Sequence, residues 1–144
     1  MVKFEVCDSR KRKYSQRGKL RIMSKRILIA EDEQEARELL TSIATMKGYD
    51  VTTVVDGVDL LHIAAVERFD VIITDLMMPH LNGASAAEIM KLQGNTTPVI
   101  ALTALTHEDL SHVQDKFTRI YNKPCDVGEL FKYVESLIEN QSGR

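Results

Sequence analysis

The 144-residue chain lacks several features that define whole classes of protein. It has no continuous apolar run of about 18 residues or more, so a transmembrane helix is not expected. Its N-terminus is basic but lacks the apolar stretch of a secretory signal peptide. It has only two cysteines, Cys7 and Cys125, far apart in the sequence. A disulfide framework is therefore not expected, and a cytoplasmic location is predicted.

Positive charge is scarce in most of the chain. Residues 1–24 carry eight Lys/Arg and two acidic residues, whereas residues 25–144 carry eleven Lys/Arg and nineteen acidic residues. The acidic body argues against a nucleic-acid surface. We interpret residues 1–23 as a disordered leader, or as a vector-derived or misassigned start, because Met23 leads straight into the first predicted strand. Residues 24–140 form one predicted domain, and 141–144 a polar tail.

Hydrophobic periodicity predicts five strands that alternate with five helices. The strands are predicted at 26–30, 51–55, 71–74, 99–102 and 119–122, and the helices at 34–47, 58–68, 84–93, 107–117 and 127–139. This alternation is typical of an α/β fold with a parallel sheet and helices on both faces. Strand 51–55 contains two threonines and is predicted at a sheet edge. Helix 107–117 has the fewest apolar positions, so we expect it to be the most loosely held.

Polar side chains gather where the predicted strands end. Glu31 and Asp32 follow the first strand, Asp75 follows the third, Thr103 the fourth and Lys123 the fifth. Because the carboxyl ends of parallel strands share one edge, these groups are expected to converge on one pocket. Three carboxylates can bind a divalent cation, and the cation with the lysine and threonine can hold a phosphoryl group.

Together these motifs resemble a known family. From Ser24 to about Asn140 the chain is similar to CheY-like receiver domains of two-component response regulators. The resemblance rests on the acidic pair Glu31-Asp32, the run Asp75-Leu76-Met77-Met78-Pro79 with Asn82-Gly83, Thr103-Ala104 and Lys123-Pro124. The spacings also fit, with 43 residues from Asp32 to Asp75, 28 more to Thr103 and 20 more to Lys123. It implies a doubly wound, flavodoxin-like fold with five helices and a five-stranded parallel sheet in the order 2-1-3-4-5.

The resemblance also implies a metal site. Asp32 would bind Mg²⁺ directly, with Mn²⁺ as a substitute, and Glu31 would assist. Asp75 would be both a ligand and the phosphoacceptor. The backbone carbonyl of Met77 would be the remaining protein ligand, since only the main chain is required there. Crowded carboxylates repel one another, so without metal their pKa values are expected to be raised.

Lys123 and Thr103 complete the implied site. Lys123 would pair with the acceptor carboxylate and then with a phosphoryl oxygen. The Thr103 hydroxyl would turn toward the phosphoryl group and repack the loop that follows. The peptide bond between Lys123 and Pro124 is expected to be cis, as in the family.

The implied function is a phosphorylation switch rather than turnover of an external substrate. The phosphoryl donor would be a sensor histidine kinase or a histidine phosphotransfer protein. Phosphorylation would shift the face formed by the fourth helix, fifth strand and fifth helix. A protein target, or a fused output domain outside this chain, would read that change. The domain would be a monomer or a weak, phosphorylation-dependent dimer with no membrane contact.

Two departures from the family pattern leave one alternative open. Ile120 stands where the family usually has a Tyr or Phe that reports phosphorylation, and Tyr121 should face the other side of the sheet. Cys125 replaces the usual Phe after Lys-Pro. The alternative is a receiver-fold binding module that works without phosphorylation.

Other readings of the same residues carry less weight. Asp32 and Thr103 could cap helices, Asp75 could belong to a turn, and Lys123 could be a solvated edge residue. A phosphatase with an aspartate nucleophile would need a second acid where Met77 stands. A dinucleotide enzyme would need glycines that residues 30–33 lack. The four histidines have no partner pattern and are interpreted as structural or surface residues, namely His62, His80, His107 and His112.

Overall fold

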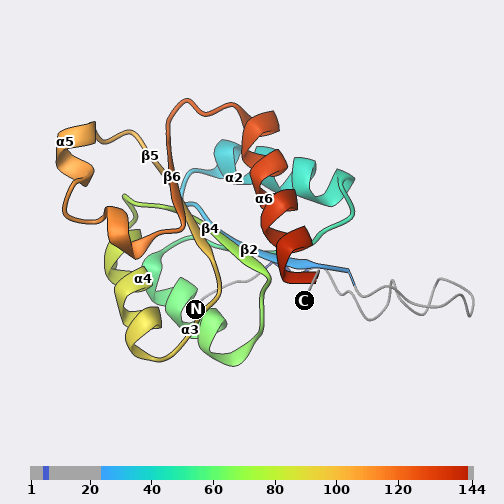
Figure 1. The fold of residues 1–144 in the computed structure, drawn as a ribbon, viewed down its shortest axis with the longest axis horizontal. Helices are drawn as coiled ribbons and strands as arrows, with labels where there is room; N and C mark the ends of the chain where they lie inside the picture. Colours follow the sequence, from blue (N-terminus) through green and yellow to red (C-terminus); the bar gives the residue numbers. More distant parts are fainter. Residues whose placement is uncertain (1–4, 7–23, 143–144) are drawn as a thin grey trace, which may run out of the picture.

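The computed structural model describes residues 5–6 and 24–142. Its described part is a six-stranded sheet between two layers of helices (Figure 1). The strands are β1 (Glu5–Val6), β2 (Arg26–Ala30), β3 (Asp50–Val54), β4 (Val71–Asp75), β5 (Val99–Thr103) and β6 (Arg119–Asn122). The helices are α2 (Gln34–Met46), α3 (Gly57–Val66), α4 (Gly83–Leu92), α5 (His107–Leu110), the 3-10 helix η1 (Gln114–Lys116) and α6 (Val127–Ser142).

Five of the strands are parallel and confirm the predicted topology. The sheet order is β1-β3-β2-β4-β5-β6, which contains the predicted order 2-1-3-4-5 once β1 is set aside. β1 pairs antiparallel with β3, so the threonine-containing strand is not the edge that its composition indicated. A two-residue strand leaves no periodic signal in the sequence. The rest of the predicted leader lies outside the described residues.

Alternate strand residues face opposite layers of the core. Leu28 and Ala30 pack with α3, α4 and α5, whereas Ile27 and Ile29 pack on the other face with α2 and α6. All four of these side chains are buried. Because both faces are covered, the strands read as nearly continuous apolar runs. In β2, β4 and β5 the acidic and hydroxyl residues of the predicted site lie at the carboxyl end of the strand or directly after it.

The predicted fourth helix is much shorter than expected. The sequence pattern predicted a helix over 107–117, but only α5 and the separate turn η1 form. Val113 leaves helical geometry, with φ −121° and ψ −4°. The buried positions are Leu110, Val113 and Phe117, so the segment is held by a few apolar anchors rather than by a full apolar face. By contrast, α6 runs on to Ser142 and takes in the first two residues of the predicted polar tail.

Gly57 allows the loop after β4 to approach the start of α3. A Cβ at Gly57 would lie 2.0 Å from the Leu81 backbone oxygen, which no side-chain rotation can relieve. We expect Gly57→Ala to lower the free energy of unfolding by about 1–3 kcal/mol, because overpacking against backbone forces the two elements apart. Urea unfolding measures this change.

Gly128 provides the matched control, since it also lies in the first turn of a helix. A Cβ there would meet only Asp126 Oδ1, at 3.1 Å. Alanine also favours a helix by up to about 1 kcal/mol over glycine. Gly128→Ala should therefore leave stability unchanged or raised, and equal losses in the two variants would contradict the steric explanation.

Candidate functional site

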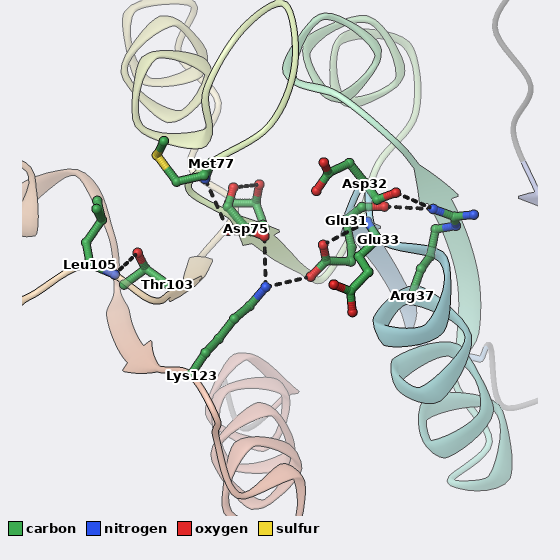
Figure 2. Close-up of polar contacts among 10 residues, drawn as sticks. Glu31, Asp32, Glu33, Arg37, Asp75, Met77, Thr103, Leu105 and Lys123 are labelled. Atoms are coloured by element: carbon green, nitrogen blue, oxygen red, sulfur yellow. Dashed lines mark hydrogen bonds and ion pairs between the residues drawn. The ribbon is translucent and has the colours of Figure 1, made fainter.

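The acidic pair follows β2 at the carboxyl edge of the sheet. Glu31 is buried at 1% exposure, whereas Asp32 is exposed. The Glu31 Oε2 atom accepts a hydrogen bond of 3.1 Å from the Glu33 amide. Arg37, one turn into α2, donates from Nη1 to the backbone oxygens of Glu31 at 3.0 Å and Asp32 at 3.4 Å (Figure 2). Arg37 thus fixes the backbone that carries the acidic pair.

Asp75 is the last residue of β4 and is buried at 7% exposure. Its Oδ1 atom accepts a hydrogen bond of 3.1 Å from the Met77 amide, and its Oδ2 atom accepts one of 2.8 Å from Lys123 Nζ. The Met77 side chain is exposed and takes no part in these contacts. Sequence periodicity predicted that β4 would stop at Thr74; the observed strand includes Asp75 and so holds its backbone rigidly.

Lys123 joins the two buried carboxylates. Its Nζ atom lies 2.8 Å from Asp75 Oδ2 and 3.0 Å from Glu31 Oε1 (Figure 2). Its backbone amide donates to the Thr103 oxygen at 2.7 Å, which anchors the end of β6 to β5. The peptide bond between Lys123 and Pro124 is cis, as the resemblance implied.

The three acids form a compact oxygen cluster. One carboxylate oxygen from each of Glu31, Asp32 and Asp75 lies within 4.8 Å of the others. Among the described residues, these three form the group of side chains that could hold a metal ion. Hard cations such as Mg²⁺ prefer oxygen ligands, and Mg²⁺ keeps several of its waters. Two buried acids and one exposed acid meet that need, because the exposed side leaves room for water. The donor set therefore fits a divalent cation.

Burial is the main influence on the titration of Glu31. Burial raises the pKa of its carboxyl, the hydrogen bonds from Glu33 and Lys123 lower it only in part, and the charge of Asp75 raises it further. The predicted increase is thus confirmed for Glu31, although desolvation contributes more than repulsion. Burial also lowers the pKa of the Lys123 ammonium, but its hydrogen bonds to Asp75 and Glu31 prevail and hold that pKa above its ordinary value.

A Glu31→Gln variant tests this electrostatic cost in metal-free buffer. Because the folded state raises the Glu31 pKa, the stability linked to that carboxyl is full below its unfolded pKa and is lost as the pH rises through the folded value. Relative to wild type, the variant should gain stability as the pH rises from about pH 4 through the folded-state pKa of Glu31. Urea unfolding across this range measures the difference, and a difference that shrinks with rising pH would contradict it.

Thr103 ends β5, the strand next to β4, and its hydroxyl is hydrogen-bonded to the following loop rather than to Asp75. Its side chain is buried, and its Oγ1 atom accepts a hydrogen bond of 3.0 Å from the Leu105 amide (Figure 2). Of the residues predicted to converge, Glu31, Asp75 and Lys123 are directly bonded, and Asp32 completes the acidic cluster. Thr103 stands at the edge of the site, with its hydroxyl bonded to the loop that leads to α5.

The departures from the family pattern fall where the strand pattern predicted. Ile120 packs against the core on the α3–α4–α5 side, and Tyr121 packs on the other side. Tyr121 meets Tyr133 edge to face, with ring centroids 6.3 Å apart. Tyr121 therefore does not replace an aromatic side chain at position 120.

Sequence reasoning missed Arg37 and gave His80 no partner. An arginine on an amphipathic helix looks like a solvated residue, so no pattern marked its bonds to the acidic loop. His80 Nδ1 lies 2.8 Å from Asp56 Oδ2, and His80 adopts a positive φ of 68°. Asp56 also caps α3 by accepting from the Asp59 amide. His80 thus joins two loops, in agreement with its interpretation as a structural residue.

No helix in the described part of the chain is both long and apolar enough to cross a membrane.

Known proteins that share this arrangement identify the family. The family model of the response regulator receiver domain matches residues 27–135. The response regulator ArlR of Staphylococcus aureus is 33% identical over 117 residues, which cover 80% of this chain and 53% of ArlR. Across curated relatives such as this one, the chain spans about a third to a half of their length.

Solved structures agree with this match. The receiver domain of the Francisella response regulator 1452 has a TM-score of 0.78 and 29% identity, covering 82% of this chain and 99% of that one. The receiver domain of the sensor histidine kinase PA1611 from Pseudomonas aeruginosa has a TM-score of 0.74 and 30% identity, covering 81% and 98%. That structure has a magnesium ion coordinated in its active site cleft. The chain described here belongs to the response regulator receiver domain family.

Proposed function

We propose that this chain is a phosphorylation switch in which Asp75 accepts a phosphoryl group from a histidine kinase or a histidine phosphotransfer protein. The observation that carries the proposal is the meeting of the Glu31, Asp32 and Asp75 carboxylates within 4.8 Å, with Lys123 bonded to two of them. A buried ion pair between Lys123 and two carboxylates would not need a third, exposed acid. A cation site beside a nucleophile needs that additional oxygen ligand, which Asp32 supplies.

Asp75 supplies the nucleophile. One of its carboxylate oxygens attacks the phosphorus of a phosphohistidine, the new O–P bond forms as the P–N bond breaks, and the imidazole leaves with the electron pair. The Met77 amide and the Lys123 ammonium hold the two oxygens of Asp75, so the carboxylate is oriented before the donor arrives. Asp75 would then carry an acyl phosphate.

The cation would be Mg²⁺, with Mn²⁺ as a substitute, held by Glu31, Asp32, Asp75 and the Met77 carbonyl. When bound, it neutralises charge on the phosphoryl oxygens. The structure of the PA1611 receiver domain with its magnesium ion supports this assignment. Lys123 offers a second positive group that can pass from the Asp75 carboxylate to a phosphoryl oxygen.

Thr103 would convert the chemistry into a change of shape. Its hydroxyl turns from the Leu105 amide to the phosphoryl group, and the loop before α5 repacks. The face formed by α5, β6 and α6 then changes its affinity for a protein target or for a fused output domain. We further propose a cytoplasmic location, a monomer or weak phosphorylation-dependent dimer, no contact between this domain and nucleic acid or membrane, and no turnover of an external substrate.

Acetyl phosphate tests the proposal without a cognate kinase. In the presence of Mg²⁺ the intact mass of the wild-type chain should rise by one phosphate, and chelation of the metal should prevent the gain. Alkaline treatment should remove the phosphate, because an acyl phosphate is labile to base. No gain of mass with Mg²⁺ would favour the alternative, a binding module that works without phosphorylation. The sequence feature behind that alternative is Ile120, which stands at the family's usual aromatic position.

A further inference from the structure

Leu105 is held through both of its backbone polar groups, the N–H and the C=O, which belong to the two successive peptide groups on either side of its Cα. Its amide donates to Thr103 Oγ1 at 3.0 Å, and its oxygen accepts a hydrogen bond of 3.0 Å from Asn122 Nδ2. One contact comes from the residue expected to move during signalling, and the other comes from the end of β6. The loop after β5 is thus bound to the strand that leads directly into Lys123.

The direction of Asn122 follows from strand alternation. Residues two apart on a strand face the same side, so Asn122 lies on the side of Ile120. Ile120 and Leu105 are both partly buried against the same core cluster, on the α3–α4–α5 side. Tyr121 faces the opposite layer. The Asn122 amide therefore lies on the side of the sheet where the Leu105 loop passes, and its exposed position leaves the bond free to break.

Little else secures this loop. Leu105 is only partly buried, and after it the chain enters α5, which has a single four-residue turn. If the Thr103 hydroxyl turns to a phosphoryl group, the Leu105 amide loses its acceptor and the backbone at Leu105 must shift. The bond from Asn122 opposes that shift, because a displaced Leu105 oxygen would leave its donor.

We propose that Asn122 is a positioning residue that holds the backbone at Leu105, and through it the Thr103 hydroxyl, in the resting arrangement. This inference rests on the proposed function. Asn122 sets how readily the loop converts when Asp75 carries a phosphoryl group. Asn122 thereby restrains the loop after β5 from a position on β6 two residues beyond Ile120. Ile120 is the position at which the family's aromatic residue is absent.

An Asn122→Leu variant tests this inference, because leucine keeps the size of the side chain and removes the donor. The probe is beryllofluoride, which binds an aspartate carboxylate as a phosphoryl analogue, titrated with saturating Mg²⁺ and followed by ¹⁹F NMR. We expect the variant to bind beryllofluoride about fivefold more tightly, which corresponds to one neutral hydrogen bond lost from the resting state. Mg²⁺ affinity without beryllofluoride should not change, since Asn122 bonds to no carboxylate in the site.

Amide exchange gives a second readout in the resting chain. The Leu105 amide should exchange faster in Asn122→Leu, because the backbone at Leu105 then loses one of the two hydrogen bonds that hold it. The control is Gln141→Met, which removes another exposed amide donor, from Gln141 Nε2 to the Asp70 oxygen at 3.2 Å. That bond lies at the opposite edge of the sheet, so the control should change neither readout.

The outcomes separate this inference from the function on which it rests. Equal or weaker beryllofluoride binding by Asn122→Leu, beside a wild type that binds it, would overturn the role of Asn122 and leave the proposed function intact. A parallel change in Mg²⁺ affinity would also overturn it, since that would indicate a general disturbance of the site. A wild type that neither binds beryllofluoride nor accepts phosphate would overturn the proposed function and this inference together.

Discussion

Replacement of Asp75 by asparagine is expected to abolish the phosphate gained from acetyl phosphate. Asparagine keeps the shape of the side chain, but its amide oxygen is not a nucleophile of carboxylate strength and cannot form the acyl phosphate. The Met77 amide can still donate to the remaining oxygen, so the loop should keep its position. Intact mass after incubation with Mg²⁺ and acetyl phosphate measures the loss.

Asp70, which directly precedes the same strand, provides a control. It precedes β4 at the opposite edge of the sheet, where its Oδ2 accepts from the Arg26 amide at 2.7 Å. Asp70→Asn keeps an oxygen acceptor there and should gain phosphate as the wild type does. A phosphate gain that persists in Asp75→Asn and disappears in Asp32→Asn would move the acceptor to Asp32 and contradict the assignment.

Replacement of Lys123 by methionine is expected to slow phosphorylation by about 100-fold or more. Removing one preorganised donor to a developing negative charge in a buried site has effects of this order. Among the described residues Lys123 is the cation bonded to Asp75, and its Nζ lies 2.8 Å from Asp75 Oδ2. Mg²⁺ affinity should be equal or higher, because a positive charge leaves the neighbourhood of the carboxylates.

The rate is measured by intact mass against time at saturating Mg²⁺. Lys132→Met, on the exposed face of α6, removes the same charge from the chain without touching the site and should keep the wild-type rate. Lys123→Met also leaves the buried Glu31 carboxylate without its cation, so circular dichroism must show that the variant is folded. A folded variant with the wild-type rate would remove Lys123 from the reaction.

The main features of the fold could be predicted because they depend on local patterns. The apolar run of β2 and the 3.6-residue apolar periodicity of α2 predicted the bounds of these elements to within one residue. The segment after β5 could not be predicted, because three buried anchors are compatible either with a continuous helix or with two short turns. The turn η1 is bonded to α4, where Lys91 donates to the Asp115 oxygen and Lys116 pairs with Glu88, and these contacts join residues 24 and 28 positions apart. β1 was missed because two residues carry no period.

The candidate site also has features that the sequence predicts and features that only the tertiary structure shows. The order and spacing of Glu31, Asp32, Asp75, Thr103 and Lys123 are properties of the sequence, and the rule that parallel strands share a carboxyl edge brings them together. The sequence by itself therefore determined the family, the sheet order and the presence of an acidic site. The acidic site follows from residue type and periodicity, whereas the family and the sheet order follow from the resemblance of the motifs to receiver domains.

Only the tertiary structure decided which groups bond to one another. It placed Lys123 between Glu31 and Asp75, turned the Thr103 hydroxyl to Leu105, and brought Asn122 to the oxygen of that same residue. These contacts join residues that lie from 2 to 92 positions apart. Their geometry depends on rotamers and loop paths that hydrophobic periodicity does not encode, because the same pattern of buried and exposed residues permits several hydrogen-bond partners at a strand end.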